Sequence, residues 1–144
     1  MKPSVAKAAF VLPLLLVLAG AAGPAAAQQF TTAAEVKPML ELTRGDWVSL
    51  RERGGEDQLL FSHILAWRCG IEAISYKVND QKRARFRAEP CYEGETRPND
   101  IKGNGFRPYV TFPLGSVKKV RVWLDYDDGS SDSETYRRAA ILLP

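Results

Sequence analysis

The stretch VKKVRVWLDYDDGSSDSETYRRAAIL, residues 117–142, decides the fold class of this chain. Apolar and polar side chains alternate from Val117 to Tyr126, so that one face of an extended segment is apolar. Residues 127–130, Asp-Asp-Gly-Ser, are types that favour a tight turn. A second strand over Ser133–Leu142 would complete a β-hairpin. We therefore expect antiparallel β-structure at this end of the chain.

Short runs rich in β-branched and aromatic residues precede this hairpin, and turn residues separate them. Gly54-Gly55 joins the first two runs into a second candidate hairpin. The predicted strands are residues 47–52, 58–67, 71–78, 83–88 and 109–112. A long irregular connection, residues 90–108, precedes the last of them. Loops of this length are often functional or mobile.

One helix is predicted before the first strand. Thr32 and Glu35 have the spacing of a capping box, in which each side chain accepts a hydrogen bond from a free backbone amide. Apolar residues follow at helical spacing, and Gly45 is a suitable stop. Pro38 leaves open whether the helix is kinked or begins later, near Lys37.

Six or seven short strands with one N-terminal helix predict a mainly β fold, an antiparallel immunoglobulin-like β-sandwich. The alternative is an open antiparallel sheet with the helix packed on one face. The chain has no internal repeat. We expect one β-rich domain over residues 28–144, which at 117 residues is long enough to form its own core.

The first 27 residues have the organisation of a signal peptide. Lys2 and Lys7 form a positively charged start, residues 8–18 are apolar apart from Pro13, and residues 25–27 are the small residues that signal peptidase prefers. A membrane span needs about 20 continuous apolar residues, which this segment lacks. We therefore expect cleavage before Gln28 and a periplasmic or secreted protein without a membrane span.

The two cysteines, Cys69 and Cys91, fit an oxidising compartment. A disulfide between them would stabilise the fold by about 3 kcal/mol. A zinc site or a catalytic thiol would need further ligands or a base, and His63 is the only histidine. We therefore predict a structural disulfide and no metal site.

Charge argues against nucleic acid as a partner. The net charge of +3 falls to +1 once Lys2 and Lys7 are removed, and an exported protein does not meet nucleic acid in the cell. Partners in the cell envelope are more plausible on both grounds.

Three segments resemble those of small exported alphaproteobacterial proteins of uncharacterised function. They are Gly45-Asp46-Trp47-Val48, Trp67-Arg68-Cys69-Gly70-Ile71 and Tyr126-Asp127-Asp128-Gly129. The resemblance implies an exported domain and no particular activity.

Two features of the sequence provide candidate binding residues: a stripe of arginines and a tryptophan on a polar face. Arg83, Arg85 and Arg87 alternate along one predicted strand, and such a stripe can hold carboxylates or phosphates. It can equally be the charged edge strand that many β-proteins use against aggregation. Trp123 lies on the polar face of its strand, where it either marks a contact surface or is covered by other parts of the chain.

Catalytic and metal-binding motifs do not stand out. Ser62 and His63 are neighbours in a predicted strand, so their side chains would point to opposite faces. The acidic residues around 125–134 could attract calcium but lack the spacing of an EF-hand loop, and they also suit a plain turn. We expect no catalytic residue and no cofactor.

These observations predict a non-enzymatic binding or accessory module that acts through a protein-interaction surface. Its partner would be another envelope protein or an anionic envelope component. The alternative is a domain that binds a small ligand or glycan through the 90–108 loop. The oligomeric state does not follow from the sequence.

Overall fold

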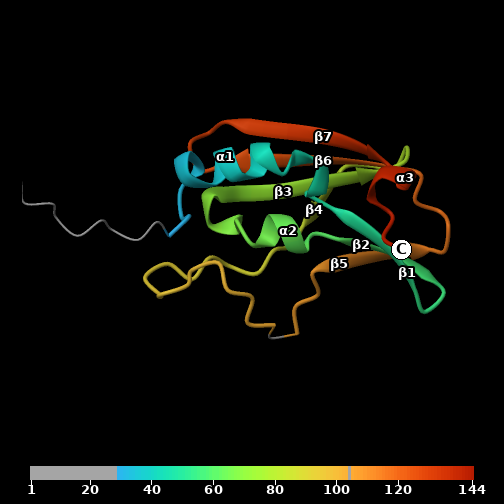
Figure 1. Ribbon diagram of the computed structural model, residues 1–144, viewed down its shortest axis with the longest axis horizontal. Helices are drawn as coiled ribbons and strands as arrows, with labels where there is room; N and C mark the ends of the chain where they lie inside the picture. Colours follow the sequence, from blue (N-terminus) through green and yellow to red (C-terminus); the bar gives the residue numbers. More distant parts are fainter. Residues whose placement is uncertain (1–28, 104) are drawn as a thin grey trace, which may run out of the picture.

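A four-stranded antiparallel sheet forms one layer of the protein (Figure 1). The computed structural model describes residues 29–103 and 105–144, so the predicted signal peptide, residues 1–27, and the cleavage point before Gln28 lie outside the described residues. The sheet order is β4-β3-β6-β7. Its strands are β3 (Ile71–Val78), β4 (Ala84–Phe86), β6 (Lys119–Tyr126) and β7 (Ser131–Arg137).

A second antiparallel sheet has three strands in the order β1-β2-β5. They are β1 (Ser49–Arg53), β2 (Glu56–Leu60) and β5 (Tyr109–Pro113). The predicted hairpin around Gly54-Gly55 is present, because β1 and β2 pair directly across it. The seven strands make the fold mainly β and sandwich-like, which confirms the predicted class.

Three α-helices accompany the sheets in the described residues: α1 (Ala33–Leu42), α2 (Ser62–Leu65) and α3 (Arg138–Ile141). The predicted N-terminal helix begins at Ala33, not near Lys37. The Glu35 carboxylate accepts hydrogen bonds from the amides of Thr31 (2.9 Å) and Thr32 (3.2 Å), and these bonds fix its start. Pro38 lies within the helix on its exposed side.

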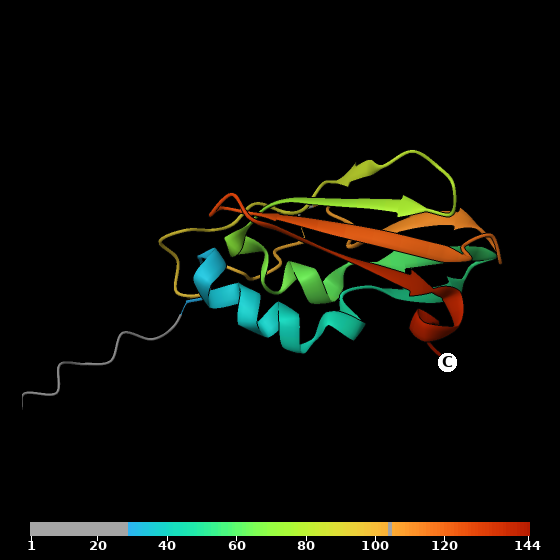
Figure 2. The same cartoon turned by 90° about the horizontal axis from the view of Figure 1, so that it is seen from above.

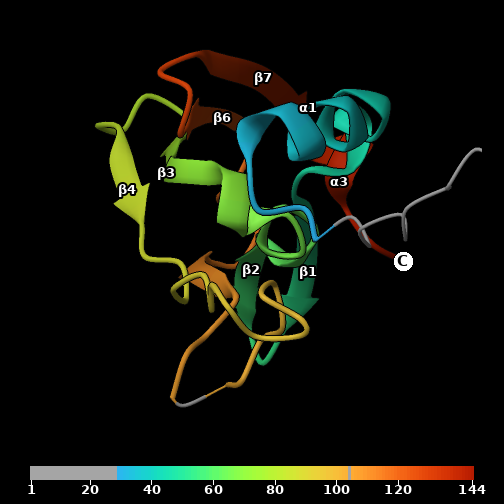
Figure 3. The same cartoon turned by 90° about the vertical axis from the view of Figure 1, so that its left-hand side faces the viewer.

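The helices α1 and α2 and the small sheet all lie on the same side of the large sheet (Figures 2 and 3). The core therefore forms on the inner face of the large sheet. Its side chains include Val120, Val122, Leu124 and Tyr126 of β6 and Val36 and Leu40 of α1. This burial follows the alternation that the sequence shows over residues 117–126.

The predicted strand over 58–67 is wrong beyond Leu60, where the chain turns into α2 and then a 3₁₀ turn at Arg68–Gly70. Phe61, Ile64 and Leu65 are all fully buried. Their spacing of three and four residues places them on one side of a helical turn. A strand would have sent them to both faces of a sheet.

The predicted return strand Ser133–Leu142 is too long at its far end. β7 ends at Arg137, and residues 138–141 form α3. Arg138 turns inward at this point and donates hydrogen bonds to the buried carboxylate of Asp57. Beyond α3, Leu142 lies beside Leu50 in an isolated parallel bridge.

Gly70 marks a close approach between the 3₁₀ turn and the start of α1. A Cβ atom at this position would lie 2.5 Å from Cγ2 of Val36 and 2.6 Å from the carbonyl oxygen of Thr32. We expect Gly70→Ala to lower the free energy of unfolding by about 2 kcal/mol through overpacking. Chemical denaturation measures the change. Gly45→Ala is the control, because its Cβ would meet no atom within 4 Å.

Candidate functional site

The outer face of the large sheet carries the candidate site. The term outer face means the side chains of β3, β4, β6 and β7 that point away from α1, α2 and the small sheet. On β6, Val122 and Leu124 point into the core, so Trp123 between them points outward. Trp123 is half-buried and does not belong to the core.

Two guanidinium groups lie over the Trp123 ring. The Cζ atom of Arg83 is 4.5 Å from the ring centroid, and that of Arg121 is 4.9 Å away. Arg83 also pairs with the Asp125 carboxylate at 3.5 Å, and Arg121 donates to the Ser133 hydroxyl at 3.2 Å. These contacts place Trp123 against two cations on an otherwise polar surface.

The predicted arginine stripe is divided by the structure. Arg85 lies opposite Ser75, and Ser75 lies opposite Trp123, so Arg85 shares the outer face with the tryptophan. Arg85 and Arg87 both line a hollow of about 400 Å³ near the disulfide, and the Arg85 guanidinium donates a hydrogen bond to the Glu72 carbonyl at 3.2 Å. Of the three predicted arginines, the structure therefore places Arg83 against Trp123, and it brings Arg85 and Arg87 to a common hollow.

Further cations on the outer face were not among the predicted site residues. β-Sheet register places Lys77 opposite Arg121, and Lys119 opposite Arg137. The signal was present in the sequence, because Lys119 and Arg121 alternate with the buried Val120 and Val122. Which strands would lie beside β6 could not be read from the sequence, so the partners of these residues stayed unknown.

The outer face concentrates positive charge. Its basic side chains are Lys77, Arg83, Arg85, Lys119, Arg121 and Arg137. Asp125 is the carboxylate that the register places among them. Because residues 28–144 carry a net charge of only +1, the rest of the surface is net negative. The charge is thus separated between faces rather than evenly mixed.

A shallow hollow of about 240 Å³ lies beside Trp123 on this face. Its lining consists of Lys77, Asn79, Lys119, Arg121, Trp123 and Thr135. The Asn79 side-chain oxygen accepts hydrogen bonds from the amides of Lys118 (2.9 Å) and Lys119 (3.1 Å), which fixes the backbone at the rim. The hollow therefore combines an aromatic wall with three cations.

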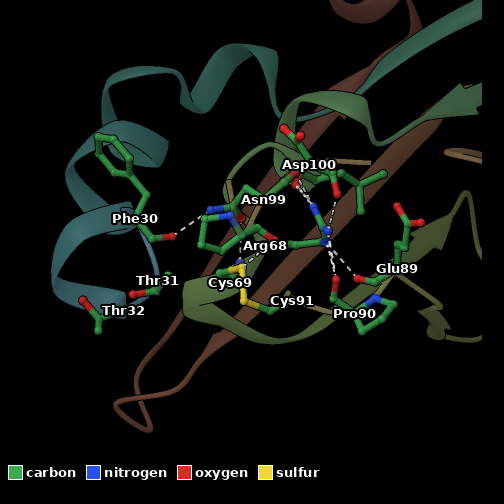
Figure 4. Close-up of a disulfide and its surroundings, with 12 residues drawn as sticks. Phe30, Thr31, Thr32, Arg68, Cys69, Glu89, Pro90, Cys91, Asn99 and Asp100 are labelled. Carbon is green, nitrogen blue, oxygen red and sulfur yellow. Dashed lines mark hydrogen bonds between the residues drawn. A yellow bond between two sulfur atoms is a disulfide. The ribbon is translucent and has the colours of Figure 1, made fainter. Parts of the chain in front are cut away.

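The disulfide between Cys69 and Cys91 is present as predicted (Figure 4). It ties the start of the 90–108 loop to the turn that precedes β3. Asn99 strengthens this connection, because its side chain accepts a hydrogen bond from the Cys69 amide and donates one to the Phe30 carbonyl, both at 2.9 Å. The loop is thus anchored at a covalent and a hydrogen-bonded point.

Buried Arg68 organises the same loop. Its guanidinium donates to five backbone carbonyl oxygens, those of Leu65, Glu89, Pro90, Asn99 and Asp100 (Figure 4). Desolvation by burial lowers the pKa of this guanidinium from its ordinary value. This role of Arg68 was not predicted from the sequence.

Buried Glu89 holds the second half of the loop. Its carboxylate accepts hydrogen bonds from the Lys102 amide (3.0 Å), the Gly103 amide (3.1 Å) and the Tyr92 hydroxyl (3.0 Å). Several polar groups of the loop are therefore already bonded to Arg68 and Glu89, which flank it.

His63 lies on α2, so the prediction of a strand histidine is wrong. Its Nε2 atom is 2.8 Å from the Thr43 hydroxyl, which connects α2 to the end of α1. Trp47 is fully buried and donates to the Leu40 carbonyl at 2.8 Å. Trp67 is half-buried and packs edge-on against Phe30. These side chains serve the packing of the inner layer.

The acidic residues near the β6–β7 turn make structural contacts. Asp127 accepts a hydrogen bond from the Ala33 amide at the start of α1 (2.9 Å). The hydroxyl and amide of Ser130 hold the pKa of the Asp128 carboxyl below its usual value. Within the described chain, no group of three or more histidine, cysteine, aspartate or glutamate side chains is placed to hold a metal ion.

No helix among residues 29–103 and 105–144 is long and apolar enough to cross a membrane. Comparison with protein-family models gives no match, and comparison with curated proteins and with solved structures gives no significant match.

Proposed function

We propose that this protein is an exported, non-enzymatic binding module that holds an acidic partner protein of the cell envelope on the outer face of its large sheet. The observation that carries the proposal is the position of Trp123. It lies outside the core, with the guanidinium groups of Arg83 and Arg121 over its ring. Tryptophan and arginine are the residue types most enriched at binding hot spots.

Charge supports an acidic partner. The basic side chains of the outer face outnumber its carboxylates, while the whole mature chain is nearly neutral. Separation of charge in this way steers an oppositely charged partner toward one face and raises its association rate. Edge strand β4 also gains protection from its arginines, but this does not account for the cations on the central strand β6.

The disulfide supports the exported compartment, because such bonds persist mainly in oxidising surroundings. The glycan-binding alternative through the 90–108 loop receives less support. Arg68 and Glu89 already occupy many hydrogen-bonding groups of that loop.

Capture of partners from an envelope extract by residues 28–144 tests this proposal, followed by titration with the purified partner. We expect Trp123→Thr and Arg85→Glu each to weaken binding at least about tenfold, as loss of a hot-spot contact does. Both melting temperatures should stay near that of the wild type, because neither side chain belongs to the core. Affinity should fall as salt is raised.

Arg53→Glu is the matched control for charge. Arg53 is exposed at the end of β1 on the small sheet, and it forms no ion pair within the described residues. It should bind like the wild type. A partner that binds both outer-face variants as tightly as the control would show that this face is not the binding surface.

A further inference from the structure

We infer that one end of the outer face is a phosphate-binding subsite formed by Lys77, Lys119, Arg121 and Arg137, here called the cation quartet. The inference rests on the proposed function and names an anionic group that the same face recognises. The ligand chemistry is a phosphate monoester, carried either by a soluble molecule or by a lipid headgroup.

The quartet forms a small grid. Lys77 on β3 lies opposite Arg121 on β6, and Lys119 on β6 lies opposite Arg137 on β7. Neighbouring strands are about 4.8 Å apart, and residues two positions apart on a strand are separated by about 7 Å. The backbone positions of four positive side chains therefore lie close together on one flat surface.

This arrangement is unfavourable without a ligand. Like charges directly opposite each other on neighbouring strands destabilise a sheet. Here two such pairs are adjacent, and within the described residues none of the four cations forms an ion pair with a carboxylate. A bound anion with more than one negative charge would remove this repulsion.

The hollow beside the quartet fits a phosphate better than a single carboxylate. Three of its lining residues, Lys77, Lys119 and Arg121, are quartet cations, and the Thr135 hydroxyl is a further hydrogen-bond donor. A phosphate monoester carries a charge of about −1.5 to −2 at neutral pH and three strong acceptor oxygens. A carboxylate carries one charge and two oxygens, so it would leave more of the quartet unpaired.

Calorimetric titration of residues 28–144 with inorganic phosphate tests the inference. We expect Lys119→Gln/Arg137→Gln to weaken phosphate binding at least about tenfold, roughly the effect of one charge-assisted hydrogen bond. The control is Arg53→Gln/Arg107→Gln, which removes two exposed cations outside the quartet and should bind like the wild type.

Thermal unfolding at low salt gives an independent readout. Without phosphate, the quartet variant should melt about 2–4 °C above the wild type, because one repulsive pair is gone. Phosphate should raise the melting temperature of the wild type and of the control, but much less that of the quartet variant. A quartet variant that melts below the wild type, or that phosphate stabilises by as many degrees as it stabilises the wild type, would overturn the inference.

Vesicles distinguish the two sources. Binding to phosphatidic acid vesicles but not to soluble phosphate would assign a lipid headgroup, and binding to both would show that the phosphate group suffices. Equal binding to phosphatidic acid and to phosphatidylglycerol, with no response to phosphate, would refute a monoester site. Partner capture that depends on Trp123 would still stand in that case, so the two proposals fail separately.

Discussion

Replacement of Arg68 by alanine is expected to lower the free energy of unfolding by about 3–4 kcal/mol, because each buried polar group left without a partner costs about 1–3 kcal/mol. Arg68 is 3% exposed and donates to five backbone carbonyl oxygens. Opening of the 90–108 loop would let water reach some of these carbonyls, which is why we expect less than the sum of five separate losses.

The loop should lose order together with stability. The carbonyls of Pro90, Asn99 and Asp100 belong to the loop, and Arg68 joins them to Leu65 at the end of α2. We therefore expect amides of the loop to exchange hydrogen faster in Arg68→Ala, while amides of β6 and β7 keep their relative protection. Hydrogen exchange read by mass spectrometry measures both.

Two further variants separate geometry from charge. Arg68→Lys keeps the positive charge, but an ammonium has three donors and cannot span the same carbonyls, so it should recover little stability. Arg97→Ala removes an exposed arginine of the same loop, whose one ion pair among the described residues is with Asp100. It should change stability by less than about 1 kcal/mol. Arg68→Ala that is as stable as Arg97→Ala would contradict the assigned role.

Local pattern was sufficient to predict the strands with one apolar face. The alternation in β6 and the turn after Tyr126 specified the closing hairpin, and the capping residues specified the start of α1. Residues 61–65 were misassigned, because the short, mostly apolar stretch from Leu59 to Leu65 fits a buried strand and a helical turn equally well. Tertiary packing around Phe61 decides between them.

The candidate site was predictable in part, because alternation shows which face of a strand a side chain lies on but not which strands lie side by side. Alternation placed Trp123 on a polar face, and it placed Arg83 and Arg85 on one side of a strand. Their proximity depends on β3 lying between β4 and β6, which is a property of sheet order. Arg68 and Asp57 gave no comparable signal, because their partners are distant in the sequence and a charged residue is by default expected at the surface.

The second large effect is expected at Asp57, which is fully buried. Its carboxylate accepts hydrogen bonds from Arg138 at 2.6 and 3.0 Å and from the amides of Gly115 and Val117, both at 3.0 Å. These contacts join β2, the 113–117 turn and α3. An asparagine has one oxygen, and its NH₂ group would face donors. We expect Asp57→Asn to cost about 3–5 kcal/mol, as loss of one partner of a buried pair does.

The pH dependence of this loss provides the test. The Arg138 guanidinium, with the two backbone amides, holds the pKa of the Asp57 carboxyl well below its usual value. The unfolded chain therefore binds a proton at higher pH than the folded one, so the contribution of Asp57 is complete above about pH 4–5 and declines as the pH falls further. Denaturant unfolding should show a smaller gap between wild type and Asp57→Asn at pH 3 than at pH 7.

Glu52 is the matched control, because its carboxylate contacts the same guanidinium at 2.5 Å but its side chain is 50% exposed. Solvent screens such a pair, so Glu52→Gln should cost less than about 1 kcal/mol. A cost for Asp57→Asn no larger than that of Glu52→Gln would refute the buried anchor. So would a gap that stays constant down to pH 3. The expected contrast would instead show that burial, rather than the presence of an ion pair, makes Asp57 essential to the C-terminal end of the fold.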